Sequence, residues 1–196
     1  MPTRLPSALL LSLVLTISAC GASMKNPDIK QNPHPTKRYE ITVTVDGAPR
    51  PFDSVQAAAG YDIANTRCVP LTSGSGATIA PEKSVPIALT RTADNVYKGM
   101  VYVDLLQDED YYGLGVCHWK MTSVSADLNI RRLTMSPFLA LDDVLTQKPV
   151  TRYFSYRSYA SSLSERVDSG HASRADFGDE ASQTFSITLA AKEDSP

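Results

Sequence analysis

The alternation of apolar and polar residues along several short segments constrains the fold of this chain most strongly. Residues 39–45 (YEITVTV) and 185–189 (FSITL) alternate at every position, and residues 85–89 (VPIAL) repeat the pattern with a proline. A period of two is typical of a strand with one buried face. Turn signals such as Asp46-Gly47 and Asp94-Asn95 separate such segments. The pattern therefore predicts an all-β fold, a single β-sandwich of about eight strands with at most two short helices.

The stretch from Val96 to Met121 holds the only tryptophan and one of the three cysteines. It contains two alternating segments joined by an acidic loop with two tyrosines, which predicts two strands that pair as a hairpin. Cys117, Trp119 and Met121 fall on one face of the second segment, and we expect that face in the core. The apolar register changes after Met121, which predicts a bulge or break near Thr122-Ser123.

Three segments depart from the strand pattern. Asp53, followed by Gln56 and an alanine run ending at Gly60, predicts one helical turn, with a polar loop as the alternative. Ser136-Pro137 ahead of helix-spaced apolar residues favours a short helix over 138–145 rather than a strand. The serine-rich, charged segment 160–180 predicts a long mobile loop or lid.

The N-terminus carries an export signal. Arg4 precedes an apolar run to Ala19, which is shorter than a membrane span of about 20 residues. The end of that run, Ile17-Ser18-Ala19-Cys20, followed by Gly21, resembles the lipobox of bacterial lipoproteins, with an aliphatic residue, two small ones and an obligatory cysteine. The resemblance implies that Cys20 becomes the acylated first residue of the mature protein. An ordinary signal peptide with an incidental cysteine is the alternative.

The lipobox resemblance also implies a location and a domain plan. Each buried methylene of an acyl chain contributes about 0.8 kcal/mol to membrane attachment. In this family an aspartate after the cysteine favours the inner membrane. Gly21 therefore implies an outer-membrane anchor that faces the periplasm. The expected plan is a signal peptide over 1–19, a polar, proline-containing tether over 20–37, a sandwich domain over 38–192 and a tail over 193–196.

If Cys20 is acylated, Cys68 and Cys117 are the two cysteines that remain. Two cysteines in an oxidising compartment predict one disulfide between them, with two buried free thiols as the alternative. A Trp two residues from a disulfide Cys resembles the packing in immunoglobulin-like sandwiches, but the spacing from Cys68 to Cys117 does not specify that family.

No catalytic or cofactor motif emerges from the sequence. His34, His118 and His171 lie in unrelated contexts and lack the local spacing of zinc ligands. The acidic group that begins at Asp108 fails the EF-hand spacing. Thr72–Gly76 lacks the ending of a phosphate loop and the Gly-x-Ser-x-Gly spacing. We therefore expect no cofactor, no metal and no enzymatic activity.

Recognition of a partner remains as the expected role. Negative charge and aromatic side chains coincide in one loop, and tyrosines have favourable interface energetics. The predicted contact residues are Asp104, Asp108, Glu109, Asp110, Tyr111 and Tyr112. Such a patch suits a basic protein partner, while the net charge of −2 with no basic cluster argues against nucleic acid.

The overall layout resembles the lipoprotein immunity proteins that bacteria carry against effectors of bacteria-killing secretion systems. The resemblance implies a small anchored β-domain that blocks the active-site cleft of a toxin. Two other classes stay open: a ligand-binding, glycan-binding or accessory module of an envelope complex, and an enzyme that uses the 160–180 segment as a lid.

Overall fold

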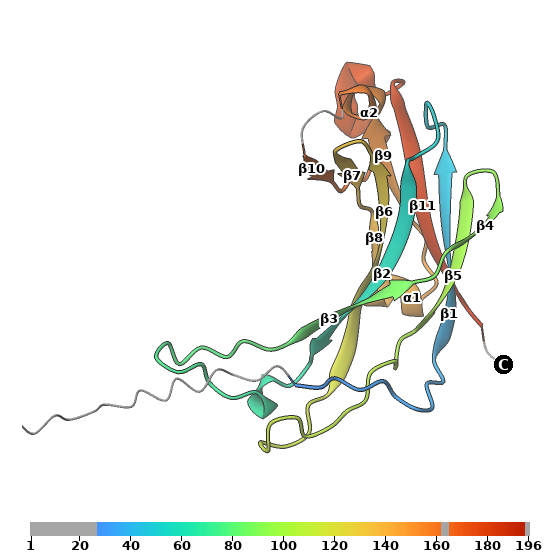
Figure 1. Cartoon of the computed structure of the whole chain (residues 1–196). Coiled ribbons are helices and arrows are strands. Elements are labelled where there is room, and N and C mark those ends of the chain that lie inside the picture. Colours follow the sequence, from blue (N-terminus) through green and yellow to red (C-terminus); the bar gives the residue numbers. More distant parts are fainter. Residues whose placement is uncertain (1–26, 162–164, 195–196) are drawn as a thin grey trace, which may run out of the picture.

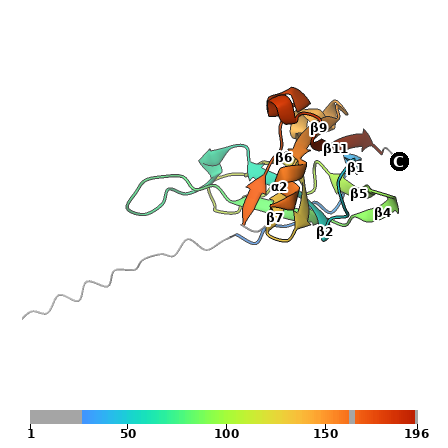
Figure 2. The same cartoon turned by 90° about the horizontal axis from the view of Figure 1, so that it is seen from above.

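The computed structural model describes residues 27–161 and 165–194, which form two sheets packed face to face (Figures 1 and 2). The first sheet has the order β4 (Thr90–Ala93), β5 (Val96–Tyr102), β1 (Arg38–Asp46), β11 (Thr184–Glu193) and β9 (Val150–Ser155). The second has the order β10 (Arg166–Asp168), β7 (Leu133–Met135), β6 (Trp119–Ile130), β2 (Ser54–Ile63) and β3 (Glu82–Ile87), and β8 (Phe138–Ala140) also pairs with β6.

The all-β prediction is confirmed, with eleven strands in the described residues rather than about eight. The additional strands β7, β8 and β10 have three residues each, too few for a period of two to be visible in the sequence. The helices are short: α1 (Leu141–Leu145), α2 (Tyr156–Ala160) and the 3-10 segments η1 (Thr66–Cys68) and η2 (Arg174–Glu180).

The core lies between the sheets and follows the period-two pattern. Ile41 and Val43 of β1 are fully buried, as are Ile187 and Leu189 of β11. Gly60 of β2 pairs with Ser123 of β6, whereas the next residue, Tyr61, pairs with Met121. Thr122 is therefore an extra residue on β6. The bulge predicted at this position is therefore confirmed.

The helical turn predicted after Asp53 is wrong, because residues 54–63 form β2. Ala57, Ala59 and Tyr61 are buried on one side of the strand. Buried residues therefore alternate with more exposed ones, as in a strand with one face in the core. Alanine has the highest helix propensity, but tertiary packing overrides that preference here. The strand pairs with β6 along its whole length.

The helix predicted over 138–145 is only partly correct. Phe138–Ala140 pairs with β6 as β8, and α1 begins at Leu141. Asp143 accepts a hydrogen bond from the backbone N–H of Ala140 at 3.2 Å, which stabilises the start of the helix three residues later than expected.

The segment predicted to be a mobile loop or lid over 160–180 contains β10 and η2. Its backbone bonds to the sandwich at His171, whose N–H donates to the carbonyl of Tyr153 at 3.0 Å. Residues 162–164 lie outside the described residues.

Near the C-terminus, β11 extends to Glu193, one residue into the predicted tail.

The hairpin predicted over 96–121 is also wrong, because β5 belongs to the first sheet and β6 to the second. The turn at Asp94-Asn95 instead pairs β5 with β4, and Asn95 has a positive φ of 60° there. Residues 103–118 cross between the sheets. Together with residues 64–81, which connect β2 to β3, they form a projection from one end of the sandwich that we call the arm (Figure 1).

The predicted tether is in part a structured segment. Residues 27–37 run along the arm, where the N–H of Asn32 donates to the carbonyl of Leu105 at 2.7 Å and the N–H of Gln107 donates to Lys30 at 3.0 Å. Backbone pairing with the arm, rather than polarity, decides the conformation of this stretch. The lipobox and the first part of the tether lie outside the described residues.

The chain crosses from β3 on the edge of one sheet to β4 on the edge of the other, and Gly99 of β5 lies under this crossover. A Cβ at Gly99 would lie 2.6 Å from Cγ2 of Ile87 and 2.8 Å from the carbonyl oxygen of Ala88. The crossover therefore requires a residue without a side chain at this position.

We predict that Gly99→Ala lowers the free energy of unfolding by about 2 kcal/mol, because the new methyl overpacks the contact. Urea denaturation would measure the change. Met100→Ala serves as the control, since the neighbouring Met100 is exposed, and it should cost less than half as much. Equal losses for the two variants would contradict the close packing.

Candidate functional site

The arm has a small core of its own. Cys68 at the end of η1 and Cys117 ahead of β6 form the predicted disulfide, with a Cα–Cα distance of 5.3 Å. Both cysteines are buried, together with Ile63 and Val69. Partly buried neighbours cover this cluster: Ala80, Tyr111, Tyr112 and Trp119. The disulfide therefore joins the two loops of the arm around an apolar centre that is separate from the main core.

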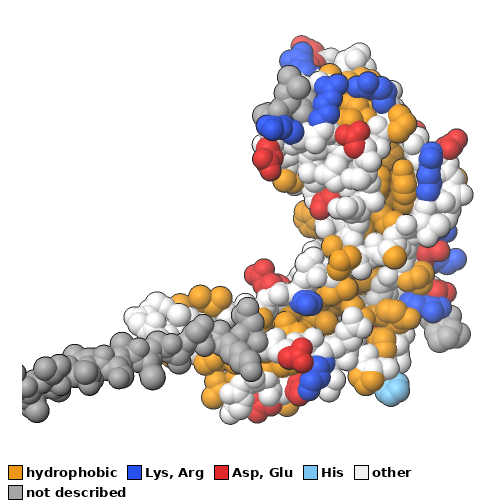
Figure 3. Space-filling model, in the orientation of Figure 1, with side chains coloured by type: hydrophobic (Ala, Val, Ile, Leu, Met, Phe, Trp, Pro, Cys, Tyr) orange, Lys and Arg blue, Asp and Glu red, His pale blue; other side chains and the backbone are white. Residues whose placement is uncertain are grey.

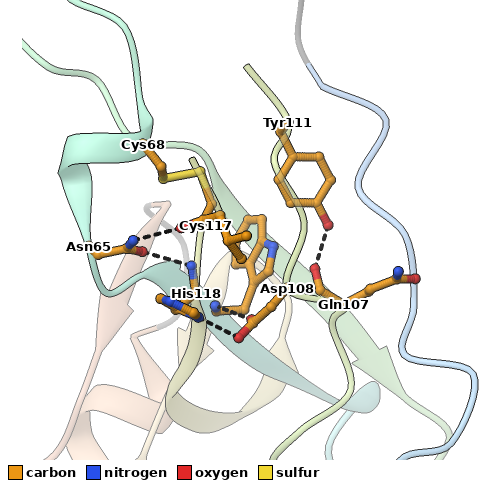
Figure 4. A network of polar contacts seen from close by, with 9 residues as sticks. Asn65, Cys68, Gln107, Asp108, Tyr111, Cys117 and His118 are labelled. Carbon is orange, nitrogen blue, oxygen red and sulfur yellow. Dashed lines mark hydrogen bonds and ion pairs between the residues drawn. A yellow bond between two sulfur atoms is a disulfide. The ribbon is translucent and has the colours of Figure 1, made fainter. Parts of the chain in front are cut away.

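Asp108 connects this centre to the start of β6 (Figure 4). One carboxylate oxygen accepts a hydrogen bond from the N–H of Trp119 at 2.8 Å, and the other lies 2.7 Å from Nδ1 of His118. Asn65 binds the same strand from the other loop. Its Oδ1 accepts from the N–H of His118 at 2.7 Å, and its Nδ2 donates to the carbonyl of Val116 at 2.8 Å. Asp108 and Asn65 thus hold the approach to β6 from both sides.

Asp104 joins the arm to the N-terminal segment. Its carboxylate accepts hydrogen bonds from the N–H of Thr36 at 2.9 Å, the hydroxyl of Thr36 at 3.1 Å and the N–H of Lys37 at 3.0 Å. Burial disfavours the charged form, but these hydrogen bonds outweigh it and hold the pKa of Asp104 below its ordinary value. The carboxylate is therefore ionised and fully engaged with the backbone.

Glu109 and Asp110 have further internal partners. Glu109 pairs with Lys30 at 2.7 Å, and both side chains are partly exposed, so the pair contributes little to stability. Asp110 accepts a hydrogen bond from the N–H of Leu114 at 3.0 Å, which closes the turn at the end of the loop. Asp110 is exposed, whereas Oε2 of Glu109 is buried and has no hydrogen-bond partner.

The two tyrosines are less exposed than the sequence predicts. The hydroxyl of Tyr111 donates to the carbonyl of Gln107 at 2.6 Å, and its ring packs edge-on against Trp119 (Figure 4). Tyr112 lies against the disulfide cluster, and burial raises its pKa. The aromatic rings belong mainly to the arm's core, because the loop has few aliphatic side chains to fill that space.

Trp119 is half-buried between the main core and the arm's core, so its predicted burial is only partly correct. Tyr61 ties the base of the arm across the sandwich. Its hydroxyl donates to the carbonyl of Tyr102 at 2.6 Å, and burial raises its pKa.

Five of the six predicted contact residues, from Asp108 to Tyr112, lie together at the disulfide end of the arm, while Asp104 lies at its base. The prediction overlooked the exposed apolar side chains of the arm: Leu71, Ile79, Leu114 and Val116. A signal was present in the sequence, since residues 69–81 and 111–117 contain no charged residue.

The described residues offer neither a metal site nor a membrane-spanning helix. Among residues 27–161 and 165–194, no group of three or more His, Cys, Asp or Glu side chains is placed to hold a metal ion. Within the same residues, no helix is long and apolar enough to cross a membrane.

The comparisons with known proteins give no family for this chain. No protein-family model matches it, and neither the curated proteins nor the solved structures contain a match.

We predict that replacing both Cys68 and Cys117 by alanine lowers the free energy of unfolding by about 4 kcal/mol, because the bond closes a loop of 49 residues. Urea denaturation would measure the loss. Proteolytic cleavage should increase first within 64–81 and 103–118. Unchanged cleavage in these loops would contradict a role of the disulfide in ordering the arm.

We predict that Asp104→Asn destabilises the protein by about 1 kcal/mol near neutral pH, since the neutral amide is a weaker acceptor than the carboxylate. The pKa of Asp104 is lower in the folded protein, so its contribution is complete above the unfolded value of about 3.9 and is lost as the pH falls through the folded pKa. Denaturation of both proteins from pH 7 to pH 2 would test this. A difference that stays constant into acid would contradict it.

Proposed function

We propose that this chain is a periplasm-facing lipoprotein that binds and neutralises a protein partner, as an immunity protein against a secreted antibacterial effector. The observation that carries the proposal is the arm, a projection tied by a disulfide that presents exposed apolar side chains beside carboxylates with fixed positions. The proposed lipid anchor at Cys20 would hold the protein on the outer membrane.

The rigidity of the arm supports binding to a protein surface. A binding element that is ordered before contact loses less conformational entropy on association. The disulfide and Asn65 connect the two loops of the arm in the free protein, and Asp108 holds the second loop against the start of β6. A projection of this kind can enter a cleft, which is how the proposed immunity function would block an active site.

The charge on the arm favours a basic partner. Asp108, Glu109 and Asp110 follow one another along one loop. Asp108 and Asp110 are exposed, whereas Glu109 is partly buried and paired with Lys30. Acidic groups held by hydrogen bonds present a defined pattern to a positively charged rim, which affects association rate and specificity. In this proposal the carboxylates both order the loop and orient the partner.

A ligand-binding or accessory module is the second candidate. A cavity of about 210 Å³ lies between the sheets at the base of the arm, and its lining includes Tyr61, Val101 and Leu105. Its volume is below the usual range for drug-sized ligands, about 300–1,000 Å³, whereas two other cavities, of about 420 Å³ beside Ala57 and Pro86 and of about 390 Å³ beside Gly99 and Met100, fall within that range. These two cavities keep small-ligand binding as the second candidate, and the proposed protein-binding role rests on the arm.

The proposal can be tested by capturing envelope proteins with the full mature chain and with a Glu109→Lys/Asp110→Lys variant. We expect a basic partner to be lost from the variant, because two attractive charges become repulsive. Asp108 is left unchanged, since it holds the N–H of Trp119. Asp142→Lys/Asp179→Lys is the matched control, with two exposed acids in α1 and η2.

The captured partner should inhibit growth when it is directed to the periplasm, and the wild-type chain should restore growth. An unchanged set of partners in the Glu109→Lys/Asp110→Lys variant would rule out the acidic contact. A partner without toxicity would rule out the immunity role.

A further inference from the structure

Exposed apolar side chains are concentrated on the arm. Of the eight large apolar side chains that are exposed among the described residues, four lie there: Leu71 (66%), Ile79 (64%), Leu114 (54%) and Val116 (46%). The other four are distributed over β5, β8, α1 and β10. Scattered exposed apolar residues are normal on a protein surface, but a group on two adjacent loops marks an interaction surface.

The loops that carry these side chains have an unusual composition. Residues 69–81 (VPLTSGSGATIAP) and 111–117 (YYGLGVC) contain no charged residue, and acidic residues stand immediately outside them, at Glu82 and Asp110. Leu114 lies between two glycines with positive φ, 74° at Gly113 and 105° at Gly115. Uncharged loop ends with leucine, isoleucine, valine and tyrosine, flanked by charges, suit the interface of a lipid bilayer.

The start of the described chain lies on the same projection. The segment that begins at Pro27 reaches the arm through the Lys30–Glu109 ion pair and the bridge between Gln31 and Leu106. Pro27 lies seven positions after Cys20, and a fully extended chain over those seven steps spans at most about 25 Å. An acyl group on Cys20 therefore keeps the arm, rather than the far end of the sandwich, beside the membrane.

Figure 3 shows the same asymmetry on one face of the molecule. Hydrophobic side chains lie on the projecting arm and in the angle where it meets the sandwich, and one group of Lys and Arg side chains lies at the opposite end, with further charged side chains along the sandwich and at the base of the arm. That opposite end carries β7, β10 and α2 (Figure 1). From above, the arm points away from the C-terminus of the chain (Figure 2).

We propose that the two uncharged loop ends of the arm, residues 71–79 and 113–116, insert into the interfacial layer of the membrane that carries the anchor. The inference rests on the proposed lipid anchor at Cys20, which is part of the proposed function. Insertion adds a second, protein-based attachment to the acyl group and fixes the orientation of the sandwich above the bilayer.

The attachment should be apolar in character. The acids next to the loop ends, Asp108 to Asp110, disfavour an anionic surface, and Lys30 is already paired with Glu109. Binding should therefore depend weakly on salt and should not increase with the fraction of anionic lipid, in contrast to a polybasic anchor.

The test uses the full mature chain with Cys20→Ser, which lacks the acyl group, and vesicles of phosphatidylethanolamine with a minority of phosphatidylglycerol. We expect this chain to float with the vesicles. Leu71→Ser/Ile79→Ser and Leu114→Ser/Val116→Ser should each reduce the partition coefficient about tenfold, since each removes two apolar side chains from the interface. Val167→Ser is the matched control, because Val167 is 70% exposed on β10, and it should bind like the parent.

A second measurement applies if the parent chain binds too weakly to float. On the acylated chain attached to the same vesicles, amide hydrogen exchange in 71–79 and 113–116 should be slower than in the Cys20→Ser chain in solution, with no change in β10. Equal exchange in the two states would overturn the proposal. A Val167→Ser loss as large as those of the arm variants would also overturn it.

Partner capture separates this inference from the proposed function. In one outcome the parent shows neither flotation nor slowed exchange, and the arm variants lose partner capture in the absence of vesicles. The apolar loop ends then contact the protein partner, so membrane insertion is wrong while the proposed function holds. If the chain binds vesicles but captures no toxic partner, the result supports membrane insertion and contradicts the immunity role.

Discussion

The Cys68–Cys117 disulfide is the interaction on which the arm depends. Neither loop of the arm has a strand to pair with along its length, and the main core ends at the base of the projection. The bond joins the loops at one point, and Ile63, Val69 and the neighbouring aromatic rings pack around it. Because a cluster of this size buries little apolar surface, a covalent link is needed to hold it together.

In the arm, carboxylates accept the backbone hydrogen bonds that strand pairing provides elsewhere in the fold. Asp104, Asp108 and Asp110 accept backbone N–H groups from Lys37, Trp119 and Leu114. Each acceptor satisfies a donor that no strand partner reaches, and hydrogen bonds to charged acceptors are stronger than those between neutral groups. The acidic composition of this stretch therefore has a structural cause, independent of any partner. A partner-binding role for these residues is a further use of side chains that the fold already requires.

The sequence was informative where one physical signal dominated. Period-two burial identified β1 and β11, and cysteine usage identified the disulfide. The pattern misleads where tertiary contacts decide the local structure. It predicts a helical turn or a polar loop for the alanine-rich first part of β2, and it pairs β5 with β6 although they lie in different sheets. The ordering of 27–37 could not be predicted either, because its partners lie about 70 residues away, as in the contact of Thr36 with Asp104.

Charge and apolar surface lie on neighbouring segments of the arm, so one projection can serve two contacts. The carboxylates lie on the segment 104–110, whereas the exposed apolar side chains lie on 71–79 and 113–116, and the two surfaces meet where Asp110 accepts the N–H of Leu114. A bilayer interface accepts the apolar loop ends but excludes buried charge, so the proposed insertion would stop at Asp110. The acidic segment would then remain in water just above the lipid, where a basic partner can reach it. Membrane attachment and partner binding are therefore compatible, provided that the partner approaches along the side of the arm.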